Sequence, residues 1–266
     1  MTSIRVESND PRLAVFRERD RQLASAQCHP EAPGGLFIAE GDLVVERALD
    51  AGYEPVALLC DDRKPLGVLD RLDASIPIYR ASAAERVTAT GLGVALDVLG
   101  LFLRRPTPEV HEVLGAARRI VGFEAVDNPT NLGSIARSAL ALGADALVLD
   151  ATSADPFARR AVRASMGATL RLPAVRFDDW ATGLQALGDA GHRLFALTPS
   201  AAARSIDLIE RDGRPCTVLL GAERVGLSPD TLARCEQVRI PMADGVDSLN
   251  VAAAAAIACH RLFAPS

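Results

Sequence analysis

The sequence predicts an α/β protein in which a small α/β domain precedes a larger domain built on a parallel sheet. Two observations lead to this fold class. Short apolar runs alternate with segments of helical periodicity along the chain of 266 residues, and such alternation is typical of parallel strands connected by helices. The runs in the second part are continuously apolar, as expected of strands that helices cover on both faces.

The first part of the chain is expected to be a small α/β unit. Asp10 followed by Pro11 predicts a helix that continues to about Ala26, because a capping residue before a proline is typical of a helix start. The other elements expected in this part are strands at 36–39, 56–60, 76–79 and within 93–103, and a helix at 42–51.

A linker and a regular alternation of strands and helices mark the second part. Two prolines within 104–108 break regular structure, so we expect one domain at 1–106 and another at 107–266. The strands expected in the second domain are at 120–125, 146–149, 170–175, 194–197, 217–220 and 237–240. Its helices are expected at 109–117, 133–142, 156–166, 180–190 and 229–235, with a last one after residue 248.

Composition restricts the class of protein. The net charge is −5, which excludes a globally basic nucleic-acid binder but leaves room for a local basic face. Lys64 is the only lysine among the 29 basic residues. The excess of arginine fits recognition of phosphate by guanidinium groups, although a G+C-rich genome is the preferred explanation.

Cysteine usage and hydropathy indicate the compartment. The five cysteines are widely spaced and form no Cys-x-x-Cys pair, so neither a disulfide framework nor a zinc site is expected. The four histidines are scattered and form no plausible metal site. No signal-like N-terminus and no apolar run of about twenty residues is found, so we expect a cytoplasmic protein without a membrane segment.

Three polar turns follow predicted strands, and ligands bind parallel sheets at the carboxyl ends of the strands. In the first turn, at 127–137, Asn131 is expected to cap the next helix and Arg137 to reach back to the mouth of the site. In the second, at 219–229, Gly221 leaves room for a ligand to lie against the backbone, and Glu223 follows it.

The third turn, at 240–251, leads into an alanine-rich helix. Ser248 is expected to cap this helix, while Leu249 and Asn250 offer backbone groups and an amide. Each turn taken alone is more simply explained as an ordinary helix start with solvated polar side chains. Only the combination of the three indicates a ligand site.

In order and spacing, the three turns resemble the motifs of the SpoU (TrmH-type) branch of the SPOUT methyltransferases. The resemblance covers about 121–262 and includes the supporting stretches Asp155–Phe157 and Arg163–Gly167. Phe37–Gly41, followed by a helix, is similar to the start of the small ribosomal-protein-like RNA-binding domain of this family. The resemblance implies 2′-O-ribose methylation of a structured RNA with S-adenosylmethionine, a deep trefoil knot and a homodimer packed through the knotted domain.

The resemblance also implies roles for individual residues. Arg137 is expected to lie nearest the 2′-hydroxyl; since arginine normally stays protonated, it orients the hydroxyl and stabilises the developing alkoxide more readily than it acts as a base. The expected catalytic residues are Arg137, Asn131, Glu223, Ser248 and Asn250. The expected cofactor-binding residues are Thr198, Gly221, Ile240 and Leu249. No metal ion is needed, and a patch that could bind RNA consists of Arg159, Arg160, Arg163 and Arg171.

Other functions fit the sequence less well. The segment Gly91–Leu96 has a leucine in place of the third glycine of a dinucleotide fingerprint, so a dinucleotide enzyme is rejected. Two alternatives stay open: a catalytically inactive RNA-binding homologue, and a base-methylating enzyme of another SPOUT branch. Ribosomal RNA is favoured over tRNA, because many ribosome-directed members carry a similar N-terminal domain.

Overall fold

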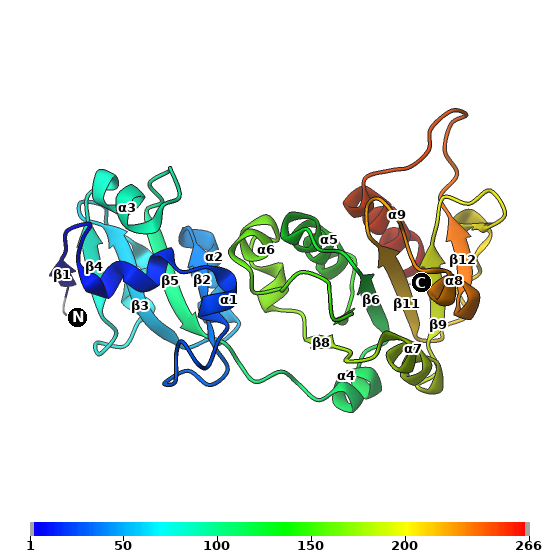
Figure 1. Cartoon of the computed structure of the whole chain (residues 1–266), viewed down its shortest axis with the longest axis horizontal. Coiled ribbons are helices and arrows are strands. Elements are labelled where there is room, and N and C mark those ends of the chain that lie inside the picture. Colours follow the sequence, from blue (N-terminus) through cyan, green and yellow to red (C-terminus); the bar gives the residue numbers. More distant parts are fainter. Residues whose placement is uncertain (1–2, 264–266) are drawn as a thin grey trace. The chain divides into compact units, whose positions relative to one another are not determined.

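The computed structural model describes residues 3–263 and divides by its contacts into two compact units. The N-terminal unit consists of Met1–Pro106 together with Phe157–Leu170. The C-terminal unit consists of Thr107–Pro156 together with Arg171–Ser266. Figure 1 colours these segments along the sequence. The chain therefore crosses between the units three times.

The N-terminal unit is built on a five-stranded sheet with the order β1-β4-β3-β5-β2. Strand β5 runs antiparallel to β2 and β3, and the other pairs are parallel. The strands are β1 (Ser3–Arg5), β2 (Leu36–Glu40), β3 (Pro55–Asp61), β4 (Ile78–Ala81) and β5 (Val98–Leu103). The helices are η1 (Pro11–Arg17), α1 (Asp20–Leu23), α2 (Asp42–Asp50), η2 (Gly67–Arg71), α3 (Ala83–Thr90), α6 (Arg159–Ala164) and η3 (Ala168–Leu170).

The long helix predicted from Asp10 to Ala26 is wrong, because this segment contains two short helices. Asp10 does cap the first of them, and its Oδ1 accepts the N–H of Arg12 at 2.9 Å. The helix η1 is a 3₁₀ helix, and the backbone is extended at residues 18 and 19 before α1 begins. Leu13 and Phe16 are buried three residues apart, which suits the repeat of a 3₁₀ helix rather than that of an α-helix.

Residues 157–170 complete the core of the N-terminal unit, although the expected second domain included them. The ring of Phe157 packs 5.2 Å from that of Phe37 and 5.9 Å from that of Tyr53, measured between centroids. Val162 and Leu170 belong to the same buried cluster as Phe37. These side chains are part of one hydrophobic core with strand β2 and helix α2.

The C-terminal unit contains seven parallel strands in the order β10-β12-β9-β11-β6-β7-β8, which confirms the predicted parallel sheet. The strands are β6 (Arg119–Glu124), β7 (Ala146–Leu149), β8 (Ala174–Arg176), β9 (Arg193–Leu197), β10 (Arg204–Ser205), β11 (Cys216–Gly221) and β12 (Glu236–Arg239). The helices are α4 (Val110–Ala116), α5 (Pro129–Ala141), α7 (Trp180–Asp189), η4 (Ile206–Leu208), α8 (Pro229–Arg234) and α9 (Val251–Phe263).

Helices cover both faces of this sheet. Ile120, Val148 and Leu219 form one cluster with side chains of α4 and α7. Neighbouring residues of a strand point to opposite faces, so the alternate positions face the other side, where α5 and α9 pack against each other and α9 lies on β11. Figure 1 shows α5 and α9 on one side of the strands and α4 and α7 on the other.

Candidate active site

Four neighbouring strands, in the order β12-β9-β11-β6, end at one edge of the sheet of the C-terminal unit. The loops that follow β9, β11 and β12, together with the start of α9, enclose a cleft of about 690 Å³. This volume lies in the range of pockets that hold small molecules and cofactors. The cleft is lined by all four of the predicted cofactor-binding residues, Thr198, Gly221, Ile240 and Leu249, and by Glu223, Ser248 and Asn250.

The first turn connects β6 to α5, and Asn128, not Asn131, caps the helix. The Oδ1 of Asn128 accepts the N–H of Thr130 at 2.9 Å, and Pro129 is the first helical residue. Asn131 lies one turn inside the helix with only 9% of its surface exposed. Its side-chain amide donates to Oε1 of Glu223. The buried amide thus ties the first turn to the second.

Arg137 lies further along α5 and is exposed. It lies six positions beyond Asn131 on the helix, a rise of about 9 Å. It does not line the cleft. Among residues 3–263, its guanidinium makes no hydrogen bond or ion pair. The structure therefore joins Asn131 to the cleft through Glu223 and leaves Arg137 as a cation available to a ligand outside it.

The second turn folds back on itself just after Gly221. A Cβ atom at Gly221 would lie 2.2 Å from the backbone carbon of Gly226 and 2.3 Å from the nitrogen of Leu227. The N–H of Gly226 donates to the carbonyl of Ala222 at 2.9 Å. Glycine is thus required here by the packing of the loop itself, whereas the sequence suggested that it makes room for a ligand.

The second turn is fastened at its far end by Ser228. The hydroxyl of Ser228 caps α8 by accepting the N–H of Thr231 at 3.2 Å. Its own N–H donates to the carboxylate of Glu124, at the end of β6, at 3.3 Å. The loop that carries Glu223 is therefore fixed both by its own backbone and by a neighbouring strand.

The third turn ends at Asn250, which takes the capping role predicted for Ser248. The Oδ1 of Asn250 accepts the N–H groups of Ala252 at 2.9 Å and Ala253 at 3.3 Å. Two acceptor contacts from one amide satisfy donors that the first turn of a helix leaves free. Ser248 and Leu249 line the cleft and are exposed.

The chemistry of the cleft suits an amphipathic ligand that carries both an aromatic ring and charged groups. Apolar walls come from Leu197, Leu220, Leu227, Ile240, Met242 and Leu249. The charged side chains of the lining are those of Glu223, Arg224 and Asp247. Apolar walls suit an aromatic ring, and the two carboxylates complement a cation.

Two features of the site were missed in the sequence. Asn128 stands directly before Pro129, the same pattern that correctly predicted a helix start at Pro11 after Asp10. The other is the contact between Asn131 and Glu223, which joins loops separated by about ninety residues and has no local signal.

The predicted patch of four arginines is divided in the structure. Arg159 and Arg163 both pair with the carboxylate of Glu40, with N···O distances of 2.6 Å and 2.8 Å. Within the described residues, the side chains of Arg160 and Arg171 make no such pair and are exposed. Arg159 and Arg163 are thus engaged with Glu40 and are less available to RNA than the sequence suggested.

Residues 3–263 show neither a cluster of metal-binding side chains nor a helix that could span a membrane. No three His, Cys, Asp or Glu side chains of this region gather in a way that would hold a metal ion. None of its helices is long and apolar enough to cross a membrane.

The chain is similar to a family of RNA-modifying enzymes. Residues 118–260 match the model of the SpoU rRNA methylase family. A protein from Mycobacterium bovis that is named an uncharacterized tRNA/rRNA methyltransferase is 41% identical over 261 residues, which cover 96% of this chain and 89% of that protein. A related protein from Synechocystis is 32% identical over 239 residues, which cover 85% of this chain and 83% of that protein.

Solved structures show the same similarity. An S-adenosylmethionine-bound rRNA methyltransferase from Sinorhizobium meliloti is 26% identical, with a TM-score of 0.80 and 97% of each chain covered. The SpoU methyltransferase AviRb from Streptomyces viridochromogenes, in complex with the same cofactor, is 25% identical, with a TM-score of 0.77 and coverage of 95% and 97%. The match of 118–260, the full-length relatives and the cofactor-bound neighbours together establish that this chain belongs to the SpoU family and is an RNA methyltransferase that uses S-adenosylmethionine.

Proposed function

We propose that this enzyme transfers the methyl group of S-adenosylmethionine to the 2′-hydroxyl of a ribose in a structured RNA. In this reaction the bond from sulfur to the methyl carbon breaks and a bond from that carbon to the 2′-oxygen forms. The products are S-adenosylhomocysteine and the 2′-O-methyl ribose, and the hydroxyl proton passes to solvent. The observation that carries the proposal is the contact of Asn131 with Glu223 at the cleft. Asn131 lies on the same helix as Arg137, whose guanidinium has no partner in the part of the chain that the structure describes.

The residues of the cleft fit the cofactor. Backbone and side-chain groups at Thr198, Gly221, Ile240 and Leu249, all of which line the cleft, would hold the adenosine. Bound there, S-adenosylmethionine supplies an activated methyl group. Glu223 and Asp247, also in the lining, add negative charge that attracts the positively charged sulfonium and amino groups.

Arg137 has the properties needed to activate a ribose hydroxyl. A guanidinium stays protonated at neutral pH, so it can hold the phosphate beside the target ribose and stabilise the alkoxide as the proton leaves. In-line transfer also requires the oxygen to lie about 3–3.5 Å from the methyl carbon. We assign this alignment to Asn131 and Glu223, and the shaping of the third turn to Ser248 and Asn250.

Ribosomal RNA is the substrate class that we favour over tRNA. The rRNA methyltransferase from Sinorhizobium meliloti is similar over 97% of this chain, a share that includes both units. A separate N-terminal unit with its own sheet provides a second surface that is suited to bind a structured RNA. The exposed side chains of Arg160 and Arg171 are available for phosphate contacts, which dominate the affinity of proteins for RNA helices.

We also propose a cytoplasmic homodimer that packs through a knotted C-terminal unit. In support, α9 returns to pack against α5 after the long third turn, and Ile257 of α9 and Val246 of the third turn are exposed by 42% and 49%. Sedimentation at micromolar concentration should give a particle of about twice 28.1 kDa. A monomer at that concentration would contradict the dimer.

The experiment that tests the proposed function locates the transferred methyl group. The enzyme is incubated with deuterated S-adenosylmethionine and total RNA from a strain that lacks the gene, and nucleosides are analysed by mass spectrometry. We expect the label on the ribose fragment. Label on the base fragment would support the base-methylating alternative. No label, together with no binding of the cofactor at high micromolar concentration, would support an inactive RNA-binding homologue.

A further inference from the structure

A loop outside the three turns holds the first of them in place. This loop, at residues 150–154, follows β7, which pairs in parallel with β6, so the carboxyl ends of the two strands lie side by side. Two of its polar side chains are buried, Asp150 with 8% and Ser153 with 6% of the surface exposed. Neither lines the cleft, and neither is explained by the proposed chemistry.

Ser153 connects this loop to the backbone at the end of β6. Its hydroxyl accepts the N–H of Val126 at 3.1 Å and donates to the carbonyl of Phe123 at 3.2 Å. The N–H of Ala154 donates to the carbonyl of Val126 at 2.9 Å. Three hydrogen bonds thus hold the backbone at 123–126 from one side.

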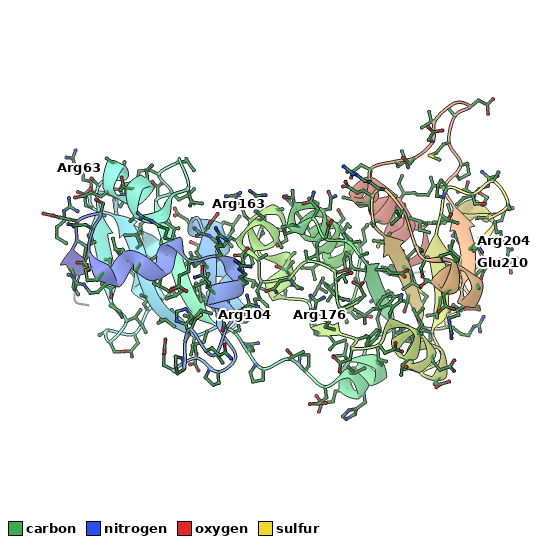
Figure 2. The ribbon with its side chains drawn as sticks, viewed as in Figure 1. Arg63, Arg104, Arg163, Arg176, Arg204 and Glu210 are labelled. Carbon is green, nitrogen blue, oxygen red and sulfur yellow. The ribbon has the colours of Figure 1, made fainter. Side chains whose placement is uncertain are left out.

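Asp150 organises the loop that makes these contacts. Its carboxylate accepts the N–H of Ser153 at 2.8 Å and the hydroxyl of Thr152 at 2.5 Å. Burial acts to raise the pKa of Asp150, but hydrogen bonds from Ser153, Thr152 and the backbone of Ala125 outweigh it and hold the pKa below its usual value. Arg176, labelled in Figure 2, donates to the carbonyl of Asp150 from strand β8.

The backbone that this loop holds is strained. Ala125 has a φ of +55°, a left-handed conformation that is uncommon for residues other than glycine, asparagine and aspartate. Such a conformation persists where the surroundings impose it. Here it turns the chain from the end of β6 toward Asn128, which caps α5, and so sets where α5 begins.

We propose that Asp150 and Ser153 are positioning residues for methyl transfer: they hold the turn at Ala125 so that α5 presents Asn131 to Glu223 and Arg137 to the RNA. This inference rests on the proposed function. It differs from a role in cofactor binding, because the cleft is formed by the loops after β9, β11 and β12 and not by the loop after β7.

The test compares two Asp-to-Asn variants at opposite ends of one strand. In Asp150→Asn, the charge is lost and an amide NH₂ replaces one of the two acceptor oxygens, so that the N–H of Ser153 or the hydroxyl of Thr152 loses its acceptor. Asp145 precedes β7 at its other end, where its carboxylate accepts the N–H groups of Arg118 and Arg119 at 2.9 Å and 2.8 Å. Asp145 also pairs with the guanidinium of Arg119 at 3.5 Å. Asp145→Asn is therefore a control that makes the same substitution beside the same strand, away from the turn at Ala125.

We expect Asp150→Asn to lower the rate of methyl transfer at saturating total RNA about tenfold to a hundredfold. The dissociation constant for S-adenosylmethionine, measured by calorimetry, should stay within about twofold of the wild-type value. Asp145→Asn should keep the rate within about twofold. Ser153→Ala is a milder change and should lower the rate severalfold. It replaces Asp150→Asn as the test variant if Asp150→Asn does not fold.

A second substitution separates positioning from a general loss of structure. Glycine adopts a positive φ without steric cost, so Ala125→Gly alone should change the rate little. In combination with Asp150→Asn it should restore most of the lost rate, because the turn then needs less support. A merely structural defect would not be repaired by a glycine at Ala125.

Hydrogen exchange gives a readout that does not depend on activity. The amides of Val126 and Ala154 should exchange at least about tenfold faster in Asp150→Asn than in the wild type or in Asp145→Asn. An Asp150→Asn enzyme with a normal rate, or an equal loss in Asp145→Asn, would overturn the inference. If the wild type methylates no RNA, the proposed function fails. In that case the exchange of the Val126 and Ala154 amides still tests the role of Asp150, and unchanged exchange in Asp150→Asn would overturn the inference by itself.

Discussion

Asn131 is the residue that links the first turn to the cleft. Asn131 lies on α5 and is buried, and its hydrogen bond to the exposed carboxylate of Glu223 joins the first turn to the second. Hydrogen bonds to a charged acceptor are about twice as strong as neutral ones, and a buried amide without an acceptor costs about 1–3 kcal/mol. The two turns are therefore expected to move together.

His192, directly before β9, gives a prediction about pH. It is 6% exposed, and its Nδ1 lies 3.0 Å from Oγ1 of Thr217. Burial lowers the pKa of His192 below 6.5, against the effect of the Cys216 and Ala117 carbonyls. Because the folded-state pKa lies below the unfolded value, the stability that the neutral ring contributes is complete above pH 6.5 and is lost as the pH falls below it.

The measurement for His192 is urea unfolding of the wild type and of His192→Gln between pH 5.5 and 7.5. The wild type should lose free energy of unfolding relative to the variant as the pH falls, by at most about 1.4 kcal/mol per pH unit. A difference between the two proteins that stays constant over this range would contradict the assignment.

At the level of elements, α6 is tied to β2 by a buried carboxylate. The side chain of Glu40 is 1% exposed and pairs with Arg159, which is 13% exposed, and with Arg163, which is 49% exposed; Figure 2 labels Arg163. Arg159 also donates to the carbonyl of Phe16 at 2.9 Å. Removing one partner of a buried pair leaves charge uncompensated, at a cost of about 3–5 kcal/mol when no other partner remains.

We therefore expect Arg159→Ala to lower the free energy of unfolding of the N-terminal unit by about 2–3 kcal/mol, since Arg163 still pairs with Glu40. Arg160→Ala is the control on the same helix. Its exposed side chain has no partner among the described residues, so its effect should stay within about 0.5 kcal/mol. Equal effects of the two substitutions in urea unfolding would show that the pair with Glu40 contributes nothing.

Elements with a strong local signal could be predicted from the sequence. A capping side chain before proline correctly located helix starts at Pro11 and Pro229, and continuous apolar runs located β6, β7, β9, β11 and β12. The strand expected at 170–175 begins only at Ala174, because Leu170 ends the 3₁₀ helix η3. Strand β10 was not predicted, because its two residues are too few to show the alternation of apolar and polar side chains that marks a strand. The cap of α9 was assigned to Ser248 instead of Asn250, because both residues are good caps and the choice depends on the path of the third turn.

At the scale of the whole molecule, the parallel sheet could be predicted because its central strands β6, β7 and β11 are apolar and buried along almost their whole length. The placement of 157–170 could not, because Phe157 and Val162 are apolar residues that suit either unit. Only their contacts with the cluster around Phe37 assign them to the N-terminal unit. The gathering of Thr198, Gly221, Ile240 and Leu249 around one cleft follows from parallel topology.

Arg137 lies outside the cleft, so its role can be tested separately from cofactor binding. The central claim is that the enzyme methylates a ribose and that Arg137 acts at the 2′-hydroxyl of that ribose. The measurement is the rate at which 2′-O-methyl nucleosides form in total RNA from a strain that lacks the gene. It is compared among the wild type, Arg137→Ala and Arg214→Ala. Arg214 is a suitable control because it pairs with Asp212, is 61% exposed and lies before β11, at the other end of the sheet.

Arg137→Ala should lower this rate about 100- to 1,000-fold, as expected when one group that stabilises a developing oxyanion is removed. Its affinity for S-adenosylmethionine should stay within about twofold of the wild-type value, because Arg137 does not line the cleft, and Arg214→Ala should behave as the wild type. An Arg137→Ala enzyme that forms 2′-O-methyl nucleosides at the normal rate would contradict the account.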